Sequence, residues 1–287
     1  MSENQFPYPM DLLCRDHPDF RCEQSGSIMD KFTLKGKKAF VTGAGGGIGF
    51  STAKAFAELG ADVCITDIPM KEDVLKAHCE YIEKTFGHKA IYTLCDVSDQ
   101  QQVWDAVNFA ADQLGTIDVC HSNAGIIQPM DNADVDVEEF RKIININLVG
   151  IMLTSRACAN IMKRDGHGGS IINTASMSGH IVNRTANKCY GFGYSTTKAG
   201  VLHLTHAMAL EYIKYGIRVN SVSPGVVLSG IHDPVPVNYL MTALEDIPAG
   251  HFGHLIDIAG AVAYLATDLA EFCVGTDLQV DGGQPLN

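Results

Sequence analysis

The stretch Lys38-Ala39-Phe40-Val41-Thr42-Gly43-Ala44-Gly45-Gly46-Gly47-Ile48-Gly49 decides the fold of this chain. The run over 38–42 predicts a buried strand, which leads directly through a glycine-rich loop into a helix predicted over 47–59. Glycines at this junction let the backbone turn tightly and approach a pyrophosphate, which binds the N–H groups at the helix start. The segment therefore predicts a dinucleotide-binding unit.

The same alternation of strand and helix continues along the chain. Further strands are predicted over 62–67, 89–95, 119–122, 170–174, 218–223 and 277–280, and further helices over 74–86, 100–114, 137–147, 149–164, 194–215 and 256–265. The strands are nearly all apolar, which indicates a parallel sheet covered on both faces. We therefore expect one α/β domain over 37–287, a doubly wound Rossmann-type fold of about seven strands. An irregular amino-terminal arm is expected over 1–36.

Composition excludes several classes of partner. The chain has 287 residues, of which 46% are hydrophobic, and a formal net charge of −12. This acidity argues against nucleic acid or an anionic membrane as the main partner. No apolar run is long enough to span a bilayer, and the start does not resemble a secretory signal. We expect a cytoplasmic protein.

The nine cysteines are irregularly spaced, and several lie in predicted strands, as Cys64, Cys95 and Cys120 do. This distribution favours reduced thiols in the core over a disulfide framework. Cys14, His17 and Cys22 form a partial set of metal ligands. A fourth ligand is not evident, so no metal site is predicted.

Asp67 ends the second predicted strand, 18 residues beyond Gly49. A carboxylate at this place accepts hydrogen bonds from the adenosine ribose hydroxyls and repels a 2′-phosphate. Ile68, Pro69 and Met70 follow it, so the nearest base is Lys71. The sequence therefore favours NAD over NADP as the cofactor.

Tyr194 and Lys198 are four residues apart in a predicted helix and so share one helix face. A free phenol has a pKa of about 10, and a neighbouring cation lowers it toward the range useful for acid–base catalysis. Such a pair also arises by chance in many helices. Its meaning depends on the rest of the chain.

The glycine loop, Asn147, Ser176 and the pair Tyr194–Lys198 together resemble the short-chain dehydrogenase/reductase family. Further motifs of this family follow in the same order: Asp96-Val97, Asn123-Ala124-Gly125, Pro224-Gly225 and Asp281-Gly282-Gly283. The resemblance covers roughly residues 37 to 283. Ser122 departs from it, because family members commonly carry an asparagine there.

The resemblance implies a role for each catalytic residue. Tyr194 would exchange a proton with the substrate oxygen, Lys198 would lower the pKa of this phenol and bind the nicotinamide ribose, and Ser176 would polarise the oxygen. Asn147 would hold a water that links the lysine to solvent, with Asn145 as the rival for this role. The cofactor contacts implied are Gly43, Gly47, Ile48, Gly49, Asp67, Asp96, Val97, Asn123, Ala124, Gly125, Tyr194, Lys198, Pro224, Gly225, Val227 and Ser229.

The distance between Ser176 and Tyr194, 18 positions, is longer than the family usually has. Tyr190 lies at the more usual distance, but its lysine would then belong at position 194, which is tyrosine. Tyr194 therefore keeps the catalytic role, and the additional residues are expected to loop out over the site.

Two loops are candidates for substrate contact, 180–193 and 226–253. The candidate contacts are Asn183, Arg184 and His232, together with Ser176 and Tyr194. A polar loop of this kind suits a hydroxyl-rich or anionic substrate, but it equally suits a solvated surface or a subunit contact. An isolated histidine such as His232 is more often a surface residue than a catalyst.

The arm before the first strand and the segment 247–253 look most like sugar-alcohol dehydrogenases and ketose reductases. The sequence is thus interpreted as an NAD-dependent oxidoreductase that interconverts a secondary alcohol and a ketone, on a polyol or sugar. The alternatives are a hydroxysteroid or other bulky-alcohol dehydrogenase, a 3-oxoacyl reductase, and a non-catalytic NAD-sensing scaffold. The resemblance also implies a homotetramer or homodimer, with 100–114, 149–164 and the last strand in the contacts.

Overall fold

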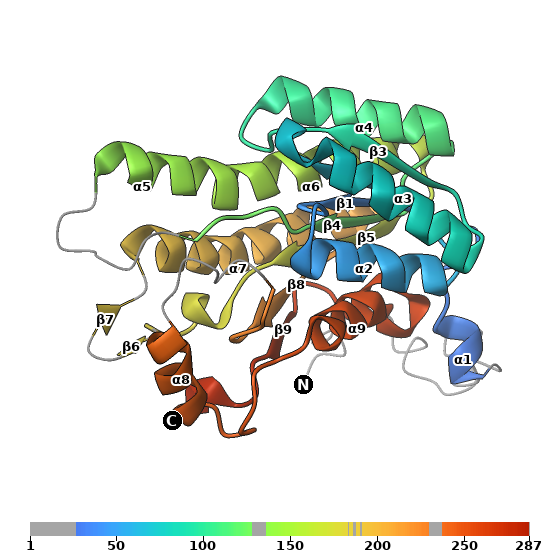
Figure 1. Cartoon of the computed structure of the whole chain (residues 1–287). Coiled ribbons are helices and arrows are strands. Elements are labelled where there is room, and N and C mark those ends of the chain that lie inside the picture. The colour runs from blue at the N-terminus through green and yellow to red at the C-terminus, as the bar shows by residue number, and fades with distance from the viewer. Residues whose placement is uncertain are drawn as a thin grey trace, which may run out of the picture.

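Seven strands form one parallel sheet at the centre of the molecule (Figure 1). In spatial order they are β3 (Ala90–Leu94), β2 (Asp62–Asp67), β1 (Lys38–Thr42), β4 (Val119–Ser122), β5 (Gly169–Thr174), β8 (Ile217–Pro224) and β9 (Asp277–Val280). The computed structural model describes residues 27–127, 136–182, 184–185, 188–189, 191–229 and 237–286. Every predicted strand is present, which confirms the sheet.

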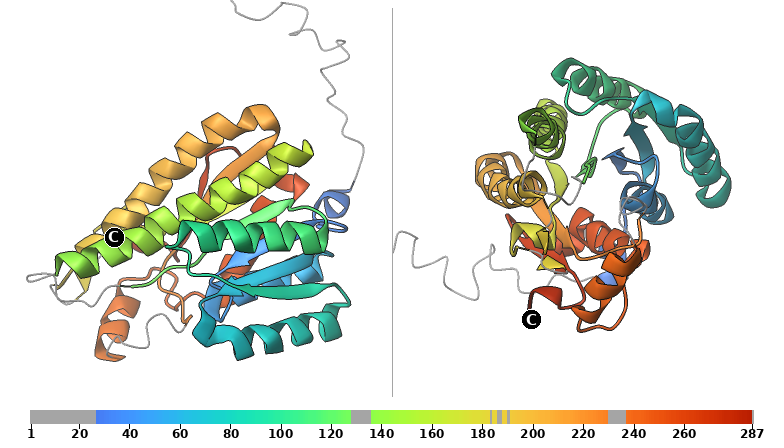
Figure 2. Two further views of the ribbon diagram at one scale, coloured as in Figure 1. Left: turned by 90° about the horizontal axis from the view of Figure 1, so that it is seen from above. Right: turned by 60° about the vertical axis from the view of Figure 1, so that its left-hand side comes forward.

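Helices cover both faces of this sheet (Figures 1 and 2). One face carries α2 (Gly47–Glu58), α3 (Glu72–Phe86) and α9 (Leu255–Ala266), and the other carries α4 (Gln100–Leu114), α6 (Gly150–Asp165) and α7 (Phe192–Tyr212). Each layer buries its own apolar cluster, with Phe56 on the first face and Phe40 on the second almost inaccessible to solvent. This is the predicted doubly wound fold.

Helices α1 and α8 and strands β6 and β7 were not predicted. Helix α1 (Ile28–Lys31) is a single turn within the region expected to be irregular, with Ser27 as its N-cap. Strands β6 (Arg184–Thr185) and β7 (Lys188–Cys189) pair antiparallel, and α8 (Val237–Glu245) lies near them in Figure 1. These elements are too short, or too weakly patterned, to be detected from periodicity.

The two helices predicted over 137–147 and 149–164 are joined without a break. Helix α5 (Val137–Ile144) continues through a π-helical turn, η3 (Asn145–Val149), directly into α6. No glycine or proline separates them before Gly150, which packs so closely on Val97 that a Cβ there would lie 2.8 Å from Val97 Cγ2. The wider π turn directs Asn147 into the interior.

Residues 1–26, which include Cys14, His17 and Cys22, lie outside the described residues. In the part of the chain that is described, histidine, cysteine and acidic side chains nowhere gather into a set of three able to hold a metal. The described helices also include none with the length and apolar character needed to cross a bilayer.

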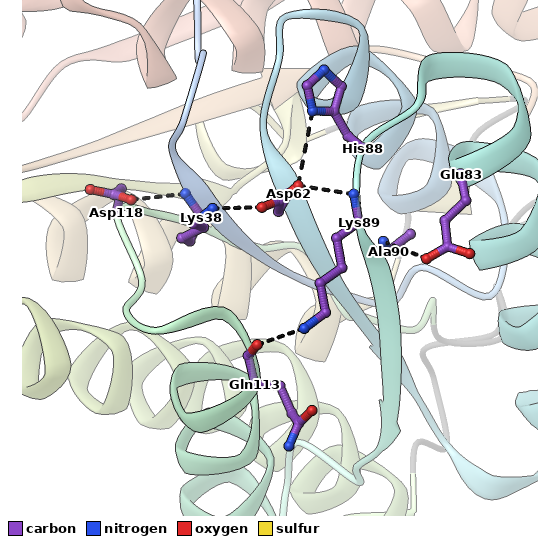
Figure 3. Close-up of polar contacts among 8 residues, drawn as sticks. All are labelled: Lys38, Asp62, Glu83, His88, Lys89, Ala90, Gln113 and Asp118. Carbon is purple, nitrogen blue, oxygen red and sulfur yellow. Dashed lines mark hydrogen bonds and ion pairs between the residues drawn. The ribbon is translucent and has the colours of Figure 1, made fainter.

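Side chains organise the amino ends of the strands, at the edge of the sheet drawn in Figure 3. Asp62 receives Lys38 Nζ at 2.5 Å on Oδ2 and the backbone N–H of Lys89 at 2.9 Å on Oδ1. Lys38 N donates to Asp118 Oδ2 at 2.8 Å, and Lys89 Nζ reaches the carbonyl oxygen of Gln113. These contacts connect β1, β2, β3 and β4 at their first residues.

Replacing Asp62 with asparagine is expected to lower the free energy of unfolding by about 1 kcal/mol at pH 7. Burial raises the pKa of this carboxyl, but the hydrogen bonds from Lys38 and Lys89 outweigh it, so the pKa falls below the ordinary 3.8. The stabilisation is therefore present above pH 3.8 and is lost as the pH falls through the lower, folded-state pKa.

Urea unfolding of wild type and Asp62→Asn across pH 3 to 8 measures this difference, with the exposed Asp112→Asn as the matched control. A gap between wild type and Asp62→Asn that persists unchanged at the acid end would contradict the assignment.

Candidate active site

A cleft of about 780 Å³ opens at the carboxyl ends of the parallel strands, where doubly wound folds bind their ligands. Loops after six of the strands line it, together with two residues of α7. Of the residues predicted for the site, the cleft is lined by Gly43, Gly47, Ile48, Asp67, Asp96, Val97, Asn123, Ala124, Gly125, Ser176, Tyr194, Lys198, Pro224, Gly225, Val227 and Ser229.

The glycine loop packs closely against its neighbours at Gly43 and faces open space at Gly46. Gly43 has a φ of +66°, and a Cβ there would lie 2.8 Å from Ala124 Cα. A Cβ at Gly46 would instead meet nothing within 4 Å. Gly46 precedes the first residue of α2, which has no side-chain cap, so the first N–H groups of this helix are available to an anion. The loop therefore fits a pyrophosphate.

Gly49 does not line the cleft. Its Cα faces the backbone of Gly43, where a Cβ would overlap the carbonyl oxygen. Its role is close packing of α2 against the end of β1.

Tyr194 and Lys198 lie on α7 and both line the cleft. Lys198 Nζ is 5.6 Å from the centroid of the Tyr194 ring and donates a hydrogen bond of 2.7 Å to the carbonyl oxygen of Thr174. Burial lowers the pKa of Lys198 to about 8, so the ammonium still carries its charge at neutral pH. The fold thus places a cation beside the ring of Tyr194.

Ser176 follows β5 and is the N-cap of a short 3₁₀ helix, η4 (Met177–Gly179). Its Oγ accepts a hydrogen bond of 3.1 Å from the N–H of Ser178. Because the hydroxyl acts as an acceptor toward its own backbone, its hydrogen remains to be donated to an oxygen in the cleft. The capping geometry thus sets the direction of this hydroxyl.

Asn147 is fully buried behind the cleft and does not line it. Its Oδ1 accepts from the N–H of Ile126 and its Nδ2 donates to the carbonyl oxygen of Ile126, both at 2.8 Å. The side chain thus fixes the segment after β4, a contact that the sequence did not predict. Its rival Asn145 is exposed.

Thr42 is a structural residue of the site that sequence reasoning missed. Its Oγ1 accepts the N–H groups of Asn123 and Ala124, each at 3.0 Å. In return, Asn123 Nδ2 donates to the carbonyl oxygen of Thr42 at 3.1 Å. The ends of β1 and β4 are therefore joined by three hydrogen bonds, which hold the glycine loop against the segment 123–125.

Asp67 and Lys71 both line the cleft and lie together against Gly45. Asp67 Oδ2 accepts the N–H of Gly45 and Oδ1 accepts the N–H of Ile68, each at 2.8 Å. The Lys71 methylenes cover Gly45, where a Cβ would lie 3.0 Å from Lys71 Cγ. The carboxylate is thus engaged by the backbone, and the methylenes of Lys71 lie against the same glycine.

Several residues without an assigned role also line the cleft. Ile126, Ile127, Lys142, Ile146, Met177, Ser178 and Val226 belong to this group. Ile126, Met177 and Val226 directly follow predicted site residues, whereas nothing in the sequence distinguishes Lys142. Of the candidate substrate contacts, Asn183 and His232 lie outside the described residues, and Arg184 is described only as part of β6.

Known proteins resemble this chain over most of its length. A family model described as enoyl-(acyl carrier protein) reductase matches residues 43–284. The probable NADP-dependent mannitol dehydrogenase of Yarrowia lipolytica is 38% identical over 265 residues, covering 90% of this chain and 91% of that protein. The sorbose reductase of Candida albicans is 35% identical over 260 residues and covers 90% of each. A short-chain type dehydrogenase/reductase from Mycobacterium marinum superposes with a TM-score of 0.86 at 38% identity, covering 91% of this chain and 100% of that one.

These relatives contradict the expectation of NAD that was drawn from Asp67. The mannitol dehydrogenases among them are named as NADP-dependent. The prediction was wrong because it treated Asp67 as a free acceptor and counted bases only directly after it in sequence. In the folded chain the helical turn after Ile68 places Lys71 against Gly45, in the same part of the cleft.

Replacing Asn147 with alanine is expected to lower the free energy of unfolding by about 2 kcal/mol, because the partly buried N–H and carbonyl of Ile126 lose their partners. Turnover should also fall at least about tenfold, since the segment after β4 forms a wall of the cleft. Thermal melting and steady-state kinetics measure both effects. Asn145→Ala, two residues away and exposed, is the matched control, and equal losses in the two variants would contradict the assignment.

Proposed function

We propose that this chain, which belongs to the short-chain dehydrogenase/reductase family, interconverts a polyol and a ketose with NADP(H). At the coarser level it is an oxidoreductase of secondary alcohols and ketones. The observation that carries the proposal is the convergence of Ser176, Tyr194 and Lys198 on the cleft that the glycine loop also lines. The finer assignment is supported by the relatives that act on mannitol and sorbose.

The residues of the cleft account for the proton chemistry. When bound, NADP(H) supplies or accepts the hydride at the substrate carbon. Tyr194 delivers the proton to the carbonyl oxygen in reduction and removes it in oxidation. Ser176 donates a hydrogen bond to the same oxygen and stabilises the charge that develops there. Lys198 stabilises the phenolate that Tyr194 becomes after donating its proton.

Absorbance of NADPH with a panel of ketohexoses, a 3-oxoacyl ester and a steroid ketone tests the substrate class. We expect turnover with a ketohexose and, in the reverse direction, with a hexitol and NADP. Turnover restricted to the steroid or the oxoacyl ester would overturn the assignment to polyols. Binding of NADPH without turnover of any member would favour a non-catalytic scaffold.

The same assay tests the catalytic phenol. Tyr194→Phe should lower kcat by roughly 10²- to 10⁴-fold, because the proton donor is lost, while NADPH binding is retained. Tyr190→Phe is the matched control, since Tyr190 has the spacing from Ser176 that is more usual in the family, and it should retain activity. The opposite pattern would transfer the catalytic role to Tyr190.

The cofactor assignment is tested at Lys71, the lysine that lines the cleft together with Gly45 and Asp67. Lys71→Gln should weaken NADPH binding about tenfold and leave NADH binding nearly unchanged, because only NADPH carries the charge that Lys71 would pair with. Fluorescence titration with each cofactor measures the two affinities. Lys76→Gln, at an exposed position on α3 that does not line the cleft, should alter neither. Equal weakening of NADH and NADPH by Lys71→Gln would exclude recognition of the phosphate.

A further inference from the structure

His121 lies inside the sheet, on β4, and is completely inaccessible to solvent. Its neighbours in register are Val41 on β1 and Ile172 on β5, both fully buried. A polar ring in such surroundings is unfavourable unless its nitrogen atoms find partners. An aliphatic residue would fill this place without that disadvantage, so packing alone does not explain the histidine.

Within the described part of the chain, only one nitrogen of this ring has a hydrogen-bond partner. Nε2 lies 2.9 Å from Thr174 Oγ1, whereas Nδ1 is buried without a partner among the described residues. The Thr174 hydroxyl donates its own hydrogen to Asn123 Oδ1, at 3.2 Å. Nε2 must therefore be the donor toward Thr174, which leaves Nδ1 as an unprotonated acceptor. Burial, reinforced by the charge of Lys198, lowers the pKa of His121 to about 3 and keeps the ring neutral.

The threonine that His121 contacts belongs to two parts of the site. Through its carbonyl oxygen, Thr174 receives the ammonium of Lys198 at 2.7 Å. Through its hydroxyl it orients the amide of Asn123, whose nitrogen then donates to the carbonyl oxygens of Thr42 and Gly43. The imidazole is thus the first donor of a chain that reaches both the catalytic lysine and the glycine loop.

We infer that His121 is a positioning residue for the reaction. Its Nε2–H fixes the direction of the Thr174 hydroxyl and the Asn123 amide, and thereby aligns the anchor of Lys198 with the cofactor loop. The inference rests on the proposed function only for its effect on turnover. Its effect on the cofactor loop is measurable without any substrate.

His121→Leu removes the donor at similar volume, and His121→Gln keeps an N–H in reach of Thr174. We expect His121→Leu to weaken NADPH binding and to lower kcat/KM, each about tenfold, which corresponds to the loss of one aligned hydrogen-bond chain. His121→Gln should recover most of both. The melting temperature of His121→Leu at pH 7 should not fall, because an unpaired buried nitrogen is replaced by apolar surface.

Val119→Ala is the matched control, because Val119 lies two residues earlier on β4, is buried on the same face and belongs to an apolar cluster. It should lower the melting temperature and leave NADPH affinity unchanged. Wild-type affinity in His121→Leu, or equal losses in His121→Leu and His121→Gln, would overturn the positioning role. Failure of the ketohexose assay alone would affect the proposed function and not this result.

A double-mutant cycle tests the chain itself. Thr174→Val removes the hydroxyl that links His121 to Asn123, so His121→Leu should cause little further loss of NADPH affinity in that background. Losses that add fully would show that the two residues act independently, and the inference would fail.

Discussion

The hydrogen bond from Lys198 Nζ to the carbonyl oxygen of Thr174 connects α7 to the sheet. An ammonium this deeply buried is unfavourable in the absence of a strong acceptor, and the end of β5 supplies one. The position of the charge next to Tyr194 therefore depends on the strand as much as on α7. Ser176 follows the same strand two residues later, so one segment of backbone sets both the lysine and a hydroxyl that lines the cleft.

Different kinds of contact hold the amino ends and the carboxyl ends of the strands. At the amino ends, charged side chains such as Lys38 and Asp62 link neighbouring strands (Figure 3). At the carboxyl ends, small polar side chains join backbone groups, as Thr42 and Asn123 do. The second arrangement leaves the glycine-loop N–H groups at the start of α2 available to a ligand. This division follows from the parallel sheet, in which all strands finish at one edge.

The sequence was most informative where a local pattern determines the structure. Apolar strands and the glycine loop predicted a parallel sheet, and the structure brings Tyr194, Ser176 and the glycine loop to one cleft at the carboxyl ends of its strands. It was least informative where the outcome depends on tertiary contacts. The π turn around Asn147 repeats no recognisable motif, and the preference for NAD failed because the position of Lys71 depends on a helical turn after β2. The sequence does not distinguish His121 from the other residues of its strand, because its partner Thr174 lies 53 residues away.

Asp67 and Lys71 are separate from the hydrogen-bond chain that runs from His121 to Lys198. This separation has an evolutionary consequence. Within the described part of the chain, no hydrogen bond joins Asp67 or Lys71 directly to Thr174, Asn123 or Lys198. Under the proposed function, substitutions after β2 would therefore alter which nicotinamide cofactor is accepted while the groups that handle the proton keep their geometry. A change in the source of reducing equivalents would then not require the chemistry to be rebuilt.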